Sequence, residues 1–246
     1  MDACSRRTFL TAAALSAGTA SLVLPRAARA EGVKIRHAVI GLGGQGTRHA
    51  RVLSGFPDCE IAALCDVDPE RLAKVGEKLP GAKLHDDFRR VLEDKSIDSV
   101  SVATPDHWHT PVALAALAAG KHVYVEKPCA QTLHEARTLR DAAARSGKVV
   151  QQGTQGRSGQ ALKDAVAFMQ EGGLGKVRAA KAINHQLREP IGRAPESAPP
   201  PGVNYDLWLG PAPKRPFTAN RWHYNWHWFW DYGSGDVGND GIHQID

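Results

Sequence analysis

The sequence predicts an α/β protein: an N-terminal doubly wound parallel sheet followed by an incomplete second α/β domain. Strand and helix patterns alternate through residues 34–151, which indicates a parallel sheet covered on both faces. A glycine-rich turn follows the first strand, and polar residues follow the ends of later strands. Ligands bind such sheets at the carboxyl ends of their strands, so these residues predict one common site.

The elements follow in order from apolar runs and from the residues that bound them. The expected strands are 34–40, 60–65, 98–103, 122–126 and 148–151. The expected helices are 47–53, 69–79, 110–119 and 133–145. Pro69 suits a first helical position after the cap Asp68, and Gly120 and Gly147 suit helix ends. Residues 104–109 are expected to form a loop.

Residues 1–30 predict a twin-arginine export signal. Arg6 and Arg7 precede a weakly apolar stretch at 11–24, and Ala28-Arg29-Ala30 is typical of a cleavage site. The stretch is shorter than the ~20 residues of a membrane-spanning helix, so no span is expected after cleavage. We therefore expect a periplasmic or secreted protein with domains at 31–150 and 151–246.

Composition limits the classes of partner. The 246 residues carry a net charge of only +5, which gives no reason to expect nucleic acid. The chain ends at Asp246, within an expected helix and without a residue that signals a helix end, so the second domain is expected to be truncated. Whether the full-length form is a homo-oligomer is left open by the sequence.

Gly41-Leu42-Gly43-Gly44-Gln45-Gly46 follows the first strand and precedes a helix, the setting that a dinucleotide-binding loop requires. Gly41 permits the tight turn, Gly43 lets the backbone approach a pyrophosphate, and Gly46 lets the helix pack closely on the strand. Asp66 ends the second strand, 20 residues after Gly46. Its carboxylate suits ribose hydroxyls and repels a 2′-phosphate, so NAD is favoured over NADP.

Further candidate cofactor ligands lie in the glycine loop and after the later strands. They are Gly44, Gln45, Thr104, His107, Trp108, His109, Glu126, Lys127 and Gln155. Arg157 is a candidate for substrate contact.

Four blocks of this sequence resemble the Gfo/Idh/MocA oxidoreductases: residues 41–46, 65–68, 103–109 and 119–128. The resemblance implies a Rossmann domain, then an α/β domain whose open sheet faces the active site. It also implies a nicotinamide cofactor and a sugar, polyol or cyclitol substrate.

Oxidation of a secondary alcohol needs a group that takes the hydroxyl proton. Lys127 is the first candidate, and the resemblance implies that it contacts substrate and cofactor. His243 matches the family's catalytic histidine and is the second candidate. Asn239 is the third candidate, because it stands where the family has an aspartate four residues before the histidine. Asparagine cannot ionise, so a carboxylate–histidine relay through this position is in doubt.

An aromatic segment precedes His243, and aromatic faces suit sugar rings. Tyr205, His223 and Trp226 are the candidate substrate contacts, with ordinary core packing as the alternative. His223 and His227 are spaced like zinc ligands but lack a third partner, so no metal is expected.

An exported enzyme has no free NAD pool, so its cofactor should be held tightly. The favoured hypothesis is a sugar or cyclitol oxidoreductase. One alternative is an NAD-dependent glycosidase acting by oxidation, elimination and reduction, which the Trp208 position disfavours because that class should have histidine there. The other is a non-catalytic NAD- or sugar-binding remnant.

Overall fold

The structure is a computed structural model that describes residues 34–246. The predicted export signal at 1–30 lies outside the described residues. Within the described part, six parallel strands form one sheet in the order β3-β2-β1-β4-β5-β6. The strands are β1 Ile35–Ile40, β2 Cys59–Cys65, β3 Lys83–His85, β4 Ser99–Val102, β5 His122–Glu126 and β6 Val150–Gly153. The strand order reverses between β1 and β4, where doubly wound sheets bind nucleotides, and the predicted fold class is confirmed.

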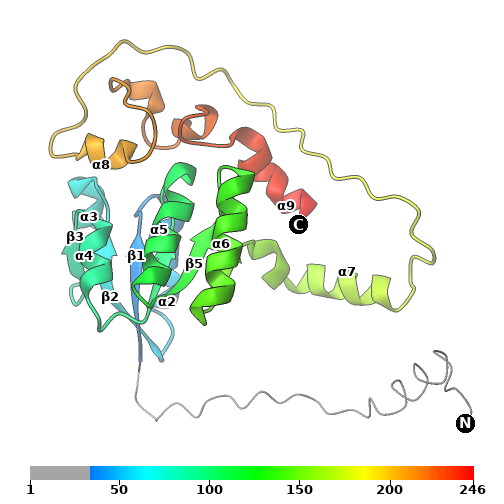
Figure 1. The fold of residues 1–246 in the computed structure, drawn as a ribbon. Helices are drawn as coiled ribbons and strands as arrows, with labels where there is room; N and C mark the ends of the chain where they lie inside the picture. The colour runs from blue at the N-terminus through cyan, green and yellow to red at the C-terminus, as the bar shows by residue number, and fades with distance from the viewer. Residues whose placement is uncertain (1–33) are drawn as a thin grey trace, which may run out of the picture. The chain divides into compact units, whose positions relative to one another are not determined.

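Helices cover both faces of this sheet (Figure 1). They are α2 Gly44–Leu53, α3 Pro69–Gly76, α4 Phe88–Glu93, α5 Asp106–Ala118 and α6 Leu133–Ser146. Val39 packs in a core with Ala50 of α2 and Val75 of α3. Its neighbours Ala38 and Ile40 belong to a second core with α4, α5 and α6. The strands are apolar on both sides because both faces are buried.

Local signals explain most of the element boundaries. Asp68 caps α3 by accepting from the backbone N–H groups of Glu70 and Arg71. Thr132 and Glu135 form a capping box at the start of α6, and Gly147 with φ 64° caps its C-terminal end. The expected loop at 104–109 is partly wrong, because α5 begins at Asp106 and contains Pro111.

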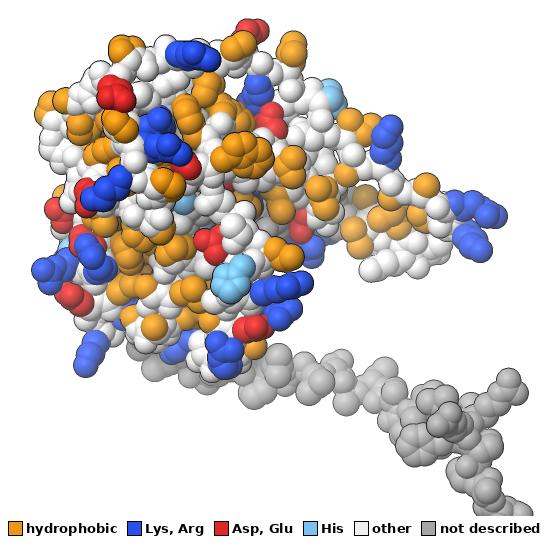
Figure 2. Space-filling model, turned by 45° about the horizontal axis from the view of Figure 1, so that its top comes forward, with side chains coloured by type: hydrophobic (Ala, Val, Ile, Leu, Met, Phe, Trp, Pro, Cys, Tyr) orange, Lys and Arg blue, Asp and Glu red, His pale blue; other side chains and the backbone are white. Residues whose placement is uncertain are grey.

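Residues after β6 form short helices and irregular segments. They include η1 Gln155–Ser158, α7 Gln160–Gln170, α8 Tyr205–Leu209, η2 Ala219–Arg221, η3 Asn225–Trp228, the π-helix η4 Val237–Gly241 and α9 Ile242–Ile245. Within 154–246 the β-structure consists of a bridge between Glu196 and Thr218. Hydrophobic side chains of α7 are exposed, among them Phe168 and Met169 (Figure 2). The second α/β domain is therefore partial. No helix of the described region is long and apolar enough to cross a membrane.

Candidate active site

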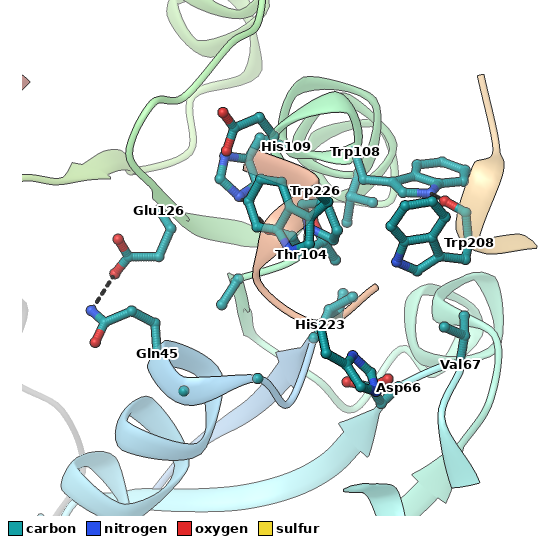
Figure 3. Close-up of a pocket in the computed structure, with 18 of the residues that line it drawn as sticks. Gln45, Asp66, Val67, Thr104, Trp108, His109, Glu126, Trp208, His223 and Trp226 are labelled. Atoms are coloured by element: carbon teal, nitrogen blue, oxygen red, sulfur yellow. Dashed lines mark hydrogen bonds between the residues drawn. The ribbon is translucent and has the colours of Figure 1, made fainter. Parts of the chain in front are cut away.

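A cavity of about 590 Å³ lies at the carboxyl ends of β1, β2, β4 and β5, with residues 207–243 completing its wall. It brings together most of the residues that the sequence singles out. These are Gly41, Gly43, Gly44, Gln45, Asp66, Thr104, Trp108, His109, Glu126, Lys127, Gln155, His223, Trp226, Asn239 and His243. Figure 3 shows Glu126 and Gln45 on one side of the cavity and Asp66 and Val67 on the other.

The glycine loop closes against the end of β4. Gly41 has φ +87°, and a β-carbon there would lie 2.6 Å from the carbonyl oxygen of Ala103. Gly46 lies beneath the cavity rather than in its lining, because it packs against the loop: a β-carbon on it would be 1.7 Å from the carbonyl oxygen of Gly41. A β-carbon on Gly44 would meet nothing within 4 Å. The loop thus leaves an open face toward the cavity.

Asp66 stands where β2 ends, held by two backbone groups. Its Oδ2 accepts from the N–H of Leu42 at 2.6 Å, and its Oδ1 accepts from the N–H of Asp68 at 2.9 Å. Burial raises the pKa of Asp66, although both hydrogen bonds and the charge of Arg71 oppose the rise. Arg71 also lines the cavity. It was not predicted, because it lies five residues after Asp66, on α3, and not directly beside it.

Glu126 is the hub of a buried polar cluster. Its Oε1 accepts from Nε2 of Gln155 at 2.7 Å, from Nε2 of Gln45 at 3.2 Å, and lies 2.9 Å from Nε2 of His49. Burial would raise the pKa of Glu126, but these hydrogen bonds and the His49 charge outweigh it and lower the pKa. The cluster ties α2 and η1 to β5 beside the cavity. His49 was not predicted, although it lies one helical turn from Gln45.

The three predicted catalytic residues line the same cavity. Nζ of Lys127 donates to the carbonyl oxygen of Asn239 at 2.7 Å and to its side-chain Oδ1 at 3.1 Å. Nδ2 of Asn239 donates to the hydroxyl of Tyr224 at 3.2 Å. His243 lies one turn further along and also lines the cavity. Asp236 and Asp240 instead pair with Arg188.

The start of α5 joins the sheet to the C-terminal segment. Oδ2 of Asp106 accepts from the N–H of Ser234 at 3.1 Å and from its hydroxyl at 2.5 Å. Nε1 of Trp108 donates to the carbonyl oxygen of Trp208 at 3.0 Å, while its ring lines the cavity. His107 is buried, and its ring nitrogens face the carbonyl oxygens of Trp208 and Tyr232. The structure thus corrects the predicted cofactor contact at His107, which is not in the cavity lining.

Thr104 and His109 line the cavity from the end of β4 and the first turn of α5. The ring of His109 bridges the carbonyl oxygens of Pro128, at 2.6 Å, and Thr104, at 2.8 Å. Within the described residues, the buried hydroxyl of Thr104 has no hydrogen-bond partner. An unsatisfied buried hydroxyl in a cavity wall suits a polar ligand group.

Two predicted substrate contacts lie elsewhere. Tyr205 packs into the C-terminal aromatic core, with its ring stacked on Trp208 at 5.6 Å between centroids. Arg157 is exposed on η1 and pairs with Asp246 at 2.7 Å. Neither lines the cavity, so both predictions of direct substrate contact are corrected: α8 turns Tyr205 into the core, and η1 carries Arg157 outward.

The remaining aromatic segment divides between core and cavity. Tyr232 is buried in the core, as the core-packing alternative expects, and Trp208 is buried but also lines the cavity. Trp226 lines the cavity too, with its ring stacked on His227 at 3.5 Å between centroids. His223 lines it too, with Nε2 2.7 Å from Oδ2 of Asp68. Burial and the nearby charge of Arg71 lower the pKa of His223 to about 4.

His223 and Tyr224 both have positive φ, 44° and 116°. Side-chain-bearing residues adopt this region at a cost, and such residues cluster at functional sites.

No metal was expected from the sequence. What the structure adds concerns residues 34–246 alone: they contain no group of three or more His, Cys, Asp or Glu side chains placed to hold a metal ion.

Two family models match this chain. One, described as "Oxidoreductase family, NAD-binding Rossmann fold", matches residues 35–154. The other, "Oxidoreductase family, C-terminal alpha/beta domain", matches residues 191–246. The chain belongs to the Gfo/Idh/MocA oxidoreductase family. Its two matched regions are those that together line the cavity.

Similar proteins carry several activities in their names. A glycosyl hydrolase family 109 protein of Stenotrophomonas maltophilia is 38% identical over 55% of this chain and 32% of its own length. A myo-inositol 2-dehydrogenase of Thermotoga maritima is 29% identical over 68% and 47%, respectively. The structure of a scyllo-inositol dehydrogenase from Lactobacillus casei with bound NAD(H) and scyllo-inositol matches with a TM-score of 0.56 and 25% identity, over 58% of this chain and 42% of that one. This Gfo/Idh/MocA chain therefore spans less than half of the length of these relatives.

The residues of this Gfo/Idh/MocA chain fit a nicotinamide dinucleotide. The positive φ of Gly41 and the open face at Gly44 form a cradle that side chains would fill. Asp66 offers a carboxylate at the end of β2, next to the glycine loop, and Thr104 offers a hydroxyl without a partner among the described residues. The chain therefore has an NAD-type cofactor site, in keeping with its NAD-binding Rossmann domain.

Proposed function

We propose that this protein is an NAD-dependent oxidoreductase that acts on a secondary hydroxyl of a sugar, glycoside or cyclitol and holds its cofactor tightly. One observation carries the proposal: Lys127, Asn239 and His243 line the same cavity as the glycine loop and Asp66. A hydride acceptor and groups able to move a proton would then share one cavity. The inositol dehydrogenases among its relatives support the substrate class.

Gly41, Gly43, Asp66 and Thr104 would hold the cofactor, which when bound supplies the hydride acceptor. The carboxylate of Asp66 suits the ribose hydroxyls of NAD and would repel the 2′-phosphate of NADP. The positive charge of Arg71 would favour the 2′-phosphate of NADP. Nε of Arg71 lies 3.6 Å from Oδ2 of Asp68, however, and the negative charge of Asp68 offsets it.

Two residues would handle the hydroxyl proton. An ammonium group has three donors, and Lys127 uses two of them on Asn239. Its remaining donor is available to a substrate oxygen, while His243 accepts the hydroxyl proton. Trp226 would cover the apolar face of a sugar ring.

The test begins with the purified protein. Denaturation should release nicotinamide, and the native protein should form NADH with at least one member of a sugar and cyclitol panel. His243→Ala should lower kcat/KM at least 100-fold while cofactor retention stays unchanged. A protein that neither releases nicotinamide nor is activated by added NAD would contradict this function and favour a non-catalytic remnant.

A second candidate is an NAD-dependent glycosidase that oxidises its substrate, eliminates the aglycone and reduces the product again. The similarity to a glycosyl hydrolase family 109 protein favours it. Release of p-nitrophenol from p-nitrophenyl glycosides without net NADH would identify this activity. Net NADH without release identifies the dehydrogenase.

We also propose export by the twin-arginine pathway, on the basis of Arg6, Arg7 and the Ala28-Arg29-Ala30 site. Fractionation of bacteria expressing the chain should find it outside the cytoplasm. Arg6→Lys together with Arg7→Lys should retain it inside, and equal export of both forms would contradict the pathway.

A further inference from the structure

Lys127, Asn239 and Tyr224 form a hydrogen-bonded chain along the cavity wall. The ammonium of Lys127 lies 3.1 Å from Oδ1 of Asn239, and Nδ2 of Asn239 lies 3.2 Å from the hydroxyl of Tyr224. Asn239 is buried, and all three residues line the cavity. Tyr224 is not among the site residues predicted from the sequence.

The chemistry of the three groups fixes the direction of each hydrogen bond. A lysine ammonium can only donate, so the amide oxygen of Asn239 must face Lys127. The amide nitrogen then faces Tyr224 and can only donate, so the phenol oxygen must accept. The proton of the Tyr224 hydroxyl is therefore not used on Asn239. Within the described residues, Asn239 is the partner of this hydroxyl.

We propose that Tyr224 donates a hydrogen bond to an oxygen of the substrate, and that Asn239 is the positioning residue that leaves this proton available. The inference rests on the proposed function for the substrate class, a polyol or the corresponding ketone. A ketone oxygen can only accept, so a free phenol donor and the remaining donor of Lys127 both suit it.

A carboxylate at position 239 would reverse the second hydrogen bond. Both of its oxygens accept, so it would take a hydrogen bond from Lys127 and another from the Tyr224 hydroxyl. The phenol proton would then point away from the substrate. Asparagine at this position thus changes what Tyr224 can recognise without changing the shape of the wall.

The backbone holds Tyr224 in this position. Tyr224 has φ 116° directly after His223 with φ 44°, and its ring packs against His227 at 4.5 Å between centroids. The hydrogen bond from His223 to Asp68 secures the same turn. Two consecutive residues in this costly region indicate that the fold fixes the direction of the Tyr224 side chain.

The direction of the hydrogen bond can be read without substrate. The chain has four tyrosines, so a Raman difference between a protein and its Tyr224→Phe variant isolates Tyr224. In the tyrosine Fermi doublet, the intensity ratio of the higher-frequency band to the lower-frequency band falls when the phenol becomes a strong hydrogen-bond donor. We expect this ratio to fall in Asn239→Asp relative to wild type and to stay unchanged in Asn220→Asp, whose side chain lies outside the cavity. An equal ratio in wild type and Asn239→Asp would overturn the inference, whatever the activity.

Kinetics with the best substrate of the panel test the consequence. Tyr224→Phe and Asn239→Asp should each lower kcat/KM about tenfold, and the double variant should be no worse than Asn239→Asp alone. Losses that multiply, or a Tyr224→Phe variant equal to wild type, would overturn the role in substrate binding. Melting temperature and retained nicotinamide show whether each variant is folded. A shifted Raman ratio with no hydride transfer by wild type would contradict the proposed function but not the hydrogen-bond direction.

Discussion

Gly46 shows how one missing methyl group shapes the nucleotide loop. A β-carbon there would lie 1.7 Å from the backbone oxygen of Gly41, whereas one on Gly44 would meet no atom within 4 Å. Gly46→Ala should therefore lower the free energy of unfolding by about 3 kcal/mol, while Gly44→Ala changes it by less than ~1 kcal/mol. Urea titration measures both. Equal stabilities would mean that α2 can move away from the loop at little cost.

Asp66 should decide which dinucleotide binds. Asp66→Asn keeps the size of the side chain and removes the charge that repels a 2′-phosphate. Its amide nitrogen cannot accept, so the variant also loses one of the two backbone hydrogen bonds that hold Asp66, from Leu42 or from Asp68. We expect the Kd for NAD to rise about tenfold and the preference for NAD over NADP to fall by more than that. Calorimetric titration with both dinucleotides gives the two constants, and Asp164→Asn on exposed α7 serves as the control. An unchanged preference would assign the discrimination to another residue.

At the scale of elements, the start of α5 attaches the C-terminal segment to the sheet. Asp106 is buried and accepts from both the N–H and the hydroxyl of Ser234. Asp106→Ala would leave both donors without their partner, at a cost of about 3 kcal/mol. We expect faster proteolytic cleavage within 205–243 and lost activity with retained cofactor. Cleavage at the wild-type rate would show that His107 and Trp108 suffice for the attachment.

The same element shows where sequence reasoning reached its limit. Polar residues at 104–109 after a strand indicated a ligand site, and Thr104, Trp108 and His109 do line the cavity. His107 does not, because its two carbonyl partners come from residues about a hundred positions later. Glycine spacing and strand ends are local signals. A partner that only tertiary packing supplies leaves no local signal.

At the scale of the whole molecule, the cavity combines two regions that the sequence treats separately. The loop at Gly41–Gly46, Asp66 and Lys127 could be predicted from the alternation of strands and helices, and His243 from a motif. The role proposed for Tyr224 could not, because it rests on the hydrogen bond from Asn239 and on two positive φ angles. The short strand β3 and helix α4 were also missed, since three residues of β3 are too few for a period.

Buried histidines should make the stability of the folded protein depend on pH. Burial, with a smaller effect of His49, lowers the pKa of His37 to about 4, and its neutral ring is satisfied by the hydroxyls of Ser99 and Ser101, each at 2.8 Å. In the unfolded chain a histidine has a pKa of about 6.5. Between the folded and unfolded pKa values, the unfolded state therefore binds more protons than the folded state. The free energy of unfolding should therefore fall as the pH drops from about 6.5 to about 4, by up to roughly 3 kcal/mol from His37.

His223 has a similarly lowered pKa of about 4 and should add to this loss over the same range. Below the folded-state value both states are protonated, and the contribution of each histidine becomes constant. Urea titrations of wild type and His37→Asn across this range measure the effect. The variant should lose less stability with falling pH, by up to about 1.4 kcal/mol per pH unit, whereas His134→Asn on the exposed side of α6 should follow wild type. If the free energy of unfolding changes with pH equally in wild type and His37→Asn, His37 binds its proton equally well in the folded and unfolded states. That result would contradict a pKa lowered by burial in the sheet.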